Sequence, residues 1–134
     1  MKKLLFLLVL VSFTLGMGCS GEKEDSKTSE SNVSMVGLPE GPLPLLAGSD
    51  PEANSQNEEG ISHFKEGHYD IALKHFREAG KVQPDPGEIH FNEALALDKL
   101  GDHGGATEHF KVAQQNANGN ELILESKILL AHIN

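Results

Sequence analysis

The chain of 134 residues has a single cysteine, no tryptophan and few basic residues. One cysteine, Cys19, excludes an intramolecular disulfide and any zinc site built from paired thiolates. Eleven Lys and Arg face 20 Asp and Glu, a net charge of −9, so nucleic acids and anionic membrane surfaces are poor partners. GxSxG, HExxH and glycine-rich phosphate motifs are also missing. The sequence therefore predicts neither an enzyme nor a bound cofactor.

The N-terminus has the composition of a secretory leader. A basic start, Met1 to Lys3, precedes an apolar run over residues 4–15, and small residues follow. This run is shorter than the ~20 residues that span a bilayer. We therefore expect residues 1–18 to form a signal peptide, with an uncleaved anchor helix as the alternative.

The segment ending in Gly18-Cys19 resembles a bacterial lipoprotein signal. The resemblance implies cleavage after Gly18, acylation of Cys19 with several chains, and attachment to a membrane of the bacterial cell envelope, on its periplasmic or outer side. Two or more acyl chains anchor a protein stably. The alternative is a cysteine beside an ordinary cleavage site. Cleavage would remove Lys2 and Lys3 and change the net charge from −9 to −11.

Residues 19–52 have the composition of a flexible linker. The first part is rich in Ser, Glu and Lys, and four prolines between residues 39 and 51 argue against a helix. The stretch Leu38 to Leu46 is more apolar than a linker requires. It either packs on the following domain as a loop or serves as a docking strip for a partner.

Residues 53–134 change to the periodicity of amphipathic helices. We expect helices near 54–66, from 69 to just before Pro84, near 88–99, near 103–116 and over 121–133. Gly67 and Gly101 end the first and third of these, and prolines follow the second. The predicted fold is all-α.

Two parts of this domain match each other at an offset of 34 residues. The matched pairs are Gly67/Gly101, Ala72/Ala106, His75/His109, Phe76/Phe110, Ala79/Ala113, Glu59/Glu93 and Lys65/Lys99. This pattern resembles the tetratricopeptide repeat, a hairpin of two helices that stacks on its neighbours. The resemblance implies units at 53–86 and 87–120, with the helix at 121–133 as a cap.

The same resemblance implies a groove lined by the first helix of each unit. Its residues would be Asn57, Ile61, Phe64, Lys65, Phe91, Asn92, Leu95, Asp98 and Lys99. Exposed Phe64, Phe91 and Leu95 would make this groove apolar and mark a partner site; the alternative is that the last helix or the Leu38 to Leu46 stretch covers them. In several peptide-binding members, an asparagine at the position of Asn92 binds the peptide backbone. The basic cluster of chaperone-binding members is not reproduced. We therefore expect an adaptor or assembly scaffold that binds a peptide or another protein.

The last predicted helix is apolar on two sides. Leu122, Leu129 and Ile133 share one face at about 100° per residue, and nothing in two repeats obviously covers it. The hypothesis is that these residues bind a second copy of the chain or a partner. The alternative is that the Leu38 to Leu46 stretch covers them.

The seven histidines suggest an alternative function, the binding of a metal or small ligand. His90 and Glu93 share a helix face, and His63, His68 and His75 lie near one turn. A metal site requires three or four converging ligands, and no close histidine pair is present in the sequence. The sequence therefore predicts no metal site and places His75 and His109 on half-exposed helix faces.

Overall fold

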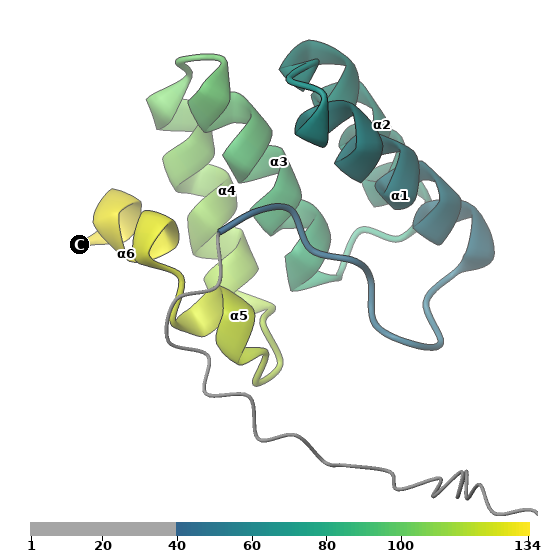
Figure 1. Ribbon diagram of the computed structural model, residues 1–134. Coiled ribbons are helices and arrows are strands. Elements are labelled where there is room, and N and C mark those ends of the chain that lie inside the picture. Colours follow the sequence, from purple (N-terminus) through teal and green to yellow (C-terminus); the bar gives the residue numbers. More distant parts are fainter. Residues whose placement is uncertain (1–39) are drawn as a thin grey trace, which may run out of the picture. The chain divides into compact units, whose positions relative to one another are not determined.

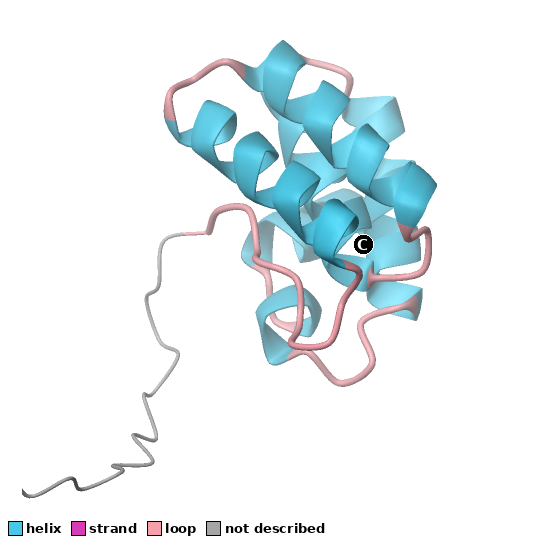
Figure 2. Cartoon of the chain, turned by 90° about the vertical axis from the view of Figure 1, so that its right-hand side faces the viewer, coloured by secondary structure: helices cyan, strands magenta, loops and turns pink. Residues whose placement is uncertain are grey.

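The computed structural model describes residues 40–134, which form six helices and no strand (Figures 1 and 2). The helices are α1 (Pro51–Lys65), α2 (Tyr69–Val82), α3 (Gly87–Lys99), α4 (His103–Gln115), α5 (Glu121–Leu124) and α6 (Lys127–Ile133). The prediction of an all-helical fold is confirmed for this part of the chain. The expected leader and Cys19 lie outside the described residues.

Local sequence explains where the helices begin. Asp50 caps α1 by accepting hydrogen bonds from the backbone N–H groups of residues 52 and 53, and Pro51 occupies the first turn. Proline is well suited to that position because its missing N–H would have no helical partner. The sequence argument against a helix at Pro51 was therefore wrong. Asp102 caps α4 in the same way, through the N–H of Gly105 at 2.9 Å.

The first four helices form two hairpins, α1 with α2 and α3 with α4, which pack together through α2 and α3. Gly67 and Gly101 lie at equivalent places in the two turns. Their φ angles are +82° and +85°, a left-handed conformation that glycine adopts without steric cost. The 34-residue offset in the sequence is therefore also an equivalence of backbone geometry.

The core contains the aromatic and small residues that the offset pairs. Phe76 and Phe110 are completely buried, as are the four alanines at 72, 79, 106 and 113. A Cβ added to Gly60 would lie 2.5 Å from the Phe76 ring, so α1 and α2 approach closely there. The helix α3 lies centrally, and every residue from 87 to 97 except His90 is buried.

The C-terminal part differs from the prediction. The single helix expected over 121–133 is two short helices, α5 and α6, separated at Glu125 and Ser126. The Ser126 hydroxyl accepts a hydrogen bond from the N–H of Leu129 at 3.2 Å and so caps a new helix. Because of this break, α6 packs against α4. The apolar face predicted for one continuous helix over 121–133 is therefore not formed.

Candidate functional site

An extended segment, residues 40–46, lies across α1 and α3 (Figure 1). We call this segment the strap. It covers the surface that the sequence predicted to be an open binding groove. Of the two alternatives for the apolar stretch, packing on the chain's own domain is the one observed for its described residues. Residues 40–52 therefore form part of the folded unit, which the predicted boundary at 53 had excluded.

Two asparagines hold the backbone of Leu43. The Leu43 N–H donates to Asn92 Oδ1 at 2.6 Å, and the Leu43 carbonyl accepts from Asn92 Nδ2 at 2.8 Å and Asn57 Nδ2 at 3.0 Å. Asn92 Nδ2 also donates to Asn57 Oδ1 at 2.8 Å. Both asparagines are completely buried. We call this pair the asparagine clamp.

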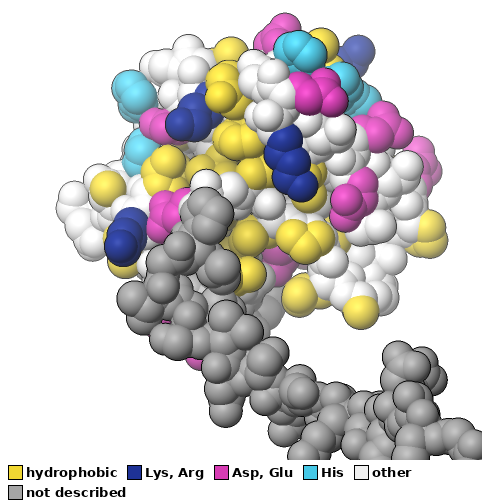
Figure 3. Space-filling model, in the orientation of Figure 1, with side chains coloured by type: hydrophobic (Ala, Val, Ile, Leu, Met, Phe, Trp, Pro, Cys, Tyr) yellow, Lys and Arg dark blue, Asp and Glu magenta, His cyan; other side chains and the backbone are white. Residues whose placement is uncertain are grey.

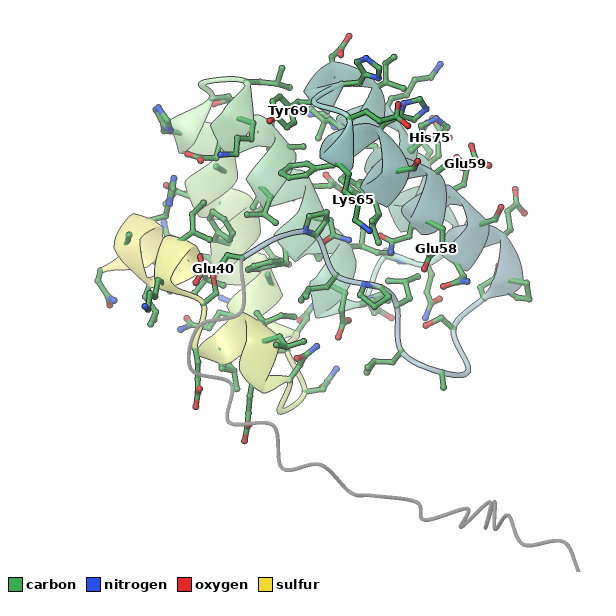
Figure 4. All side chains as sticks on the ribbon, viewed as in Figure 1. Glu40, Glu58, Glu59, Lys65, Tyr69 and His75 are labelled. Atoms are coloured by element: carbon green, nitrogen blue, oxygen red, sulfur yellow. The ribbon has the colours of Figure 1, made fainter. Side chains whose placement is uncertain are left out.

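Side chains of the strap complete its docking. Leu43 packs against the main core, and Leu45 is buried in a second cluster with Ala53, Ala79 and Ile89. At the start of the strap, the Glu40 carboxylate accepts from the backbone N–H groups of Lys127 and of Ile128, the latter at 2.8 Å. Glu40 is labelled in Figure 4. The strap thus contacts both units and α6.

The predicted groove residues lie together but are mostly covered. Asn57, Ile61, Phe91, Asn92 and Leu95 are buried. Phe64 and Asp98 are partly buried, whereas Lys65 and Lys99 are exposed; Figure 4 labels Lys65. Of the two alternatives for the groove, coverage by the Leu38 to Leu46 stretch is therefore the one observed, since the strap lies on Asn57 and Asn92.

The three residues expected to form a C-terminal interface do not share a free surface. Leu129 is completely buried in the chain's own core, and Ile133 packs against that core. Only Leu122 is exposed, at 40%. The hypothesis of one interface over these three residues was wrong because the break at Ser126 points Leu129 inward.

A shallow pocket remains beside the strap. It is lined by strap residues 43–46 and by residues 118–122, which include the turn before α5. Leu46, exposed at 59%, and Leu122 give it an apolar rim. In Figure 3, hydrophobic side chains gather across the middle of the face that carries the strap.

Polar side chains repeat between the units as well. Glu59 lies 3.4 Å from His75, and Glu93 lies 3.4 Å from His109; Figure 4 labels the first pair. Gln56 and His90 occupy the third equivalent position. Gln56 Oε1 lies 3.0 Å from His75 Nδ1, whereas His90 Nδ1 lies 3.4 Å from His109 Nδ1. The second unit therefore brings two histidines and a carboxylate together.

Burial changes the pKa values of Glu93 and His109 in the second unit. The Glu93 side chain is 8% exposed, against 54% for Glu59. Burial raises the pKa of the Glu93 carboxyl to about 7, with the Arg77 charge acting in the opposite direction. Burial also lowers the pKa of His109, and the charges of His90 and Arg77 lower it further, while Asp102 opposes them.

Sequence reasoning found Asn92 through the family resemblance and placed His90 and Glu93 on one helix face, but it did not bring His109 to them. The three side chains come from α3 and α4, so no short motif contains all of them. The available signal was the repeat offset, which places His90 where the first unit has Gln56.

Comparison with known proteins adds no relative. No protein-family model matches the chain, and no curated protein matches it. Within residues 40–134, no helix has the length and apolar character needed to cross a membrane.

Proposed function

We propose that the protein is a tetratricopeptide-like adaptor that binds an extended segment of another protein across α1 and α3. It acts as a binding module and not as an enzyme. The proposal is supported by the 34-residue match and by the two equivalent hairpins.

The observation that carries the proposal is the asparagine clamp around Leu43. It contacts both the N–H and the carbonyl of one residue, at 2.6–3.0 Å. These groups belong to the main chain of every non-proline residue, so the clamp is suited to any extended peptide with a suitable side chain. The partly buried position of Leu43 and the buried position of Leu45 then supply selectivity for leucines two residues apart.

The strap itself defines the ligand class. Its sequence from residue 40 to 46, EGPLPLL, has prolines on both sides of Leu43, which favour an extended conformation before binding. We infer that the partner supplies an extended Leu-x-Leu segment that displaces the strap. An intramolecular competitor at millimolar effective concentration weakens the apparent affinity for that segment.

A matched pair of strap variants tests the proposal. Leu43→Asp places a charge in the packed position, whereas Leu46→Asp changes a residue that is already 59% exposed. The probe is a fluorescent synthetic peptide of residues 40–48, added to the full-length chain in detergent solution. Polarisation should show the peptide binding at least about tenfold more tightly to L43D than to wild type or L46D, because release of the strap frees the site.

Specificity is checked in the double variant L43D/N92A and with a scrambled peptide. Loss of the clamp should remove the gain in affinity, and the scrambled peptide should not bind. Equal affinity of L43D and wild type for the strap peptide would contradict the proposal, provided that circular dichroism shows both to be folded.

We also propose that acylated Cys19 attaches the adaptor to the bacterial cell envelope. The support is the leader composition and the position of the only cysteine. Cys19→Ala should move the protein from the membrane to the soluble fraction. An unmodified N-terminal cysteine in mass spectrometry of the native protein would contradict this part alone and leave the peptide site unaffected.

A further inference from the structure

We propose that His90, Glu93 and His109 form a binding site for a first-row divalent cation, with Zn²⁺ as the best match. All three ligand atoms lie within 4.8 Å of one another. Two imidazoles and a carboxylate, with a water as fourth ligand, are a common zinc set. The site shares no residue with the asparagine clamp, and zinc binding can be measured without peptide.

Two of the distances within the cluster fit a tetrahedral ion better than direct hydrogen bonds. Zinc bonds of about 2.0–2.1 Å place neighbouring ligand atoms of a tetrahedron about 3.3–3.4 Å apart. His109 Nδ1 lies 3.4 Å from both His90 Nδ1 and Glu93 Oε2. Hydrogen bonds between such atoms are normally shorter, about 2.7–3.2 Å.

A hydrogen bond at Nε2 orients the His90 ring so that its Nδ1 can bind a metal ion. Its Nε2 lies 3.0 Å from the carbonyl oxygen of Pro84, which can only accept a hydrogen bond. The proton of the neutral ring therefore belongs on Nε2, and the lone pair of Nδ1 points toward His109. A histidine ligand that donates its other N–H to a carbonyl is the usual outer-shell arrangement of metal sites.

The carboxylate is the buried member of the cluster. Glu93 is buried on the central helix α3, and a Cβ added to Gly80 would lie 3.3 Å from its Oε1. Gly80 of α2 thus leaves just enough room for the carboxylate. The partly exposed rings of His90 and His109 leave a side open to solvent for the ion and its water.

The other two histidine clusters among residues 40–134 are less suitable. In one, Asp98 Oδ1 lies 2.8 Å from His103 Nδ1 and 3.0 Å from His132 Nε2, which are hydrogen-bond distances. The other is an exposed turn in which Glu66 lies 3.8 Å from His63 and 3.2 Å from His68. Neither contains a buried carboxylate.

The first repeat unit provides the matched control. At the equivalent positions it has Gln56, an exposed Glu59 and His75. His90→Gln therefore introduces into the second unit the side chain that the first unit already accommodates. This variant should fold like the wild type, which a thermal melt without metal will verify.

The experiment is calorimetric titration of the metal-free, untagged full-length chain with Zn²⁺ alone, in detergent and on a C19S background that removes the only thiol. H90Q and H109Q should each lose one equivalent of zinc or weaken its binding by more than the roughly 10–100-fold that outer-shell changes cost. His75→Gln should bind as wild type. Co²⁺ should show the visible absorption of a tetrahedral ion in wild type and lose it in H90Q.

Three results would overturn the site. They are no zinc binding by the wild type, unchanged zinc binding by a folded H90Q variant, or loss of the ion in H68Q or H103Q in place of H90Q. Since the titration contains no peptide, failure of the metal site leaves the proposed peptide site unaffected.

Discussion

Removal of the Asn92 side chain should be among the most costly single changes in the domain. Asn92→Ala leaves the Leu43 N–H and Asn57 Oδ1 without the bonds of 2.6 and 2.8 Å that they now make. An unsatisfied buried polar group costs about 1–3 kcal/mol. Two such groups give an expected loss of about 2–6 kcal/mol in the free energy of unfolding, a large part of a typical domain's 5–15 kcal/mol.

Asn57→Ala is the control for Asn92→Ala, because it removes the other asparagine of the clamp. In this variant the Leu43 carbonyl still accepts from Asn92, and only one Asn92 N–H loses its acceptor. The expected cost is about 1–3 kcal/mol. Because the two side chains bond to each other and share Leu43, the double variant should cost less than the sum of the single changes, with a coupling of about 0.5–3 kcal/mol.

Urea unfolding followed by circular dichroism gives the three free energies, and amide hydrogen exchange reports on Leu43 itself. The Leu43 amide should be protected in the wild type and lose protection in N92A. Equal costs for the two single variants would refute the assigned hydrogen bonds. Exchange of the wild-type Leu43 amide at the unfolded rate would refute docking of the strap.

Three further predictions concern the core. Phe76→Ala should cost about 3–5 kcal/mol because the ring is completely buried; a melting shift of one or two degrees would contradict this. Leu129→Ala should cost about 2–5 kcal/mol, whereas Leu122→Ala, at a site 40% exposed, should change the unfolding free energy in urea by less than about 0.5 kcal/mol. Gly87→Ala should destabilise by about 1–3 kcal/mol, since its Cβ would lie 2.8 Å from a backbone oxygen; Gly104→Ala, with nothing nearer than 3.8 Å, should be neutral or raise the melting temperature.

Helical periodicity and the 34-residue offset predicted the first four helices, the turns at Gly67 and Gly101 and the burial of Phe76 and Phe110. These features depend on local patterns that recur in the sequence. The α5–α6 break was harder to predict, because Ser126 as a helix cap competes with an apolar pattern that could continue through it. Leu129 consequently faces inward and not outward.

The strap and the histidine cluster depend on contacts that no local pattern contains. Leu43 meets Asn92 at a separation of 49 residues, and prolines made its segment resemble a linker. His90 meets His109 across two helices. Sequence supplied the residue types for both sites, whereas their convergence follows from how the hairpins stack.

The strap contacts also imply an order of events during folding. Each hairpin closes over short separations, whereas the strap bonds reach 49 residues to Asn92 and 88 residues to Ile128. Contacts of short separation form first because they close smaller loops. The clamp has one asparagine from each unit, so it is complete only after the units have stacked. The strap, which is synthesised before the six described helices, is therefore expected to dock last, and until then Leu43 and Leu45 are exposed to water.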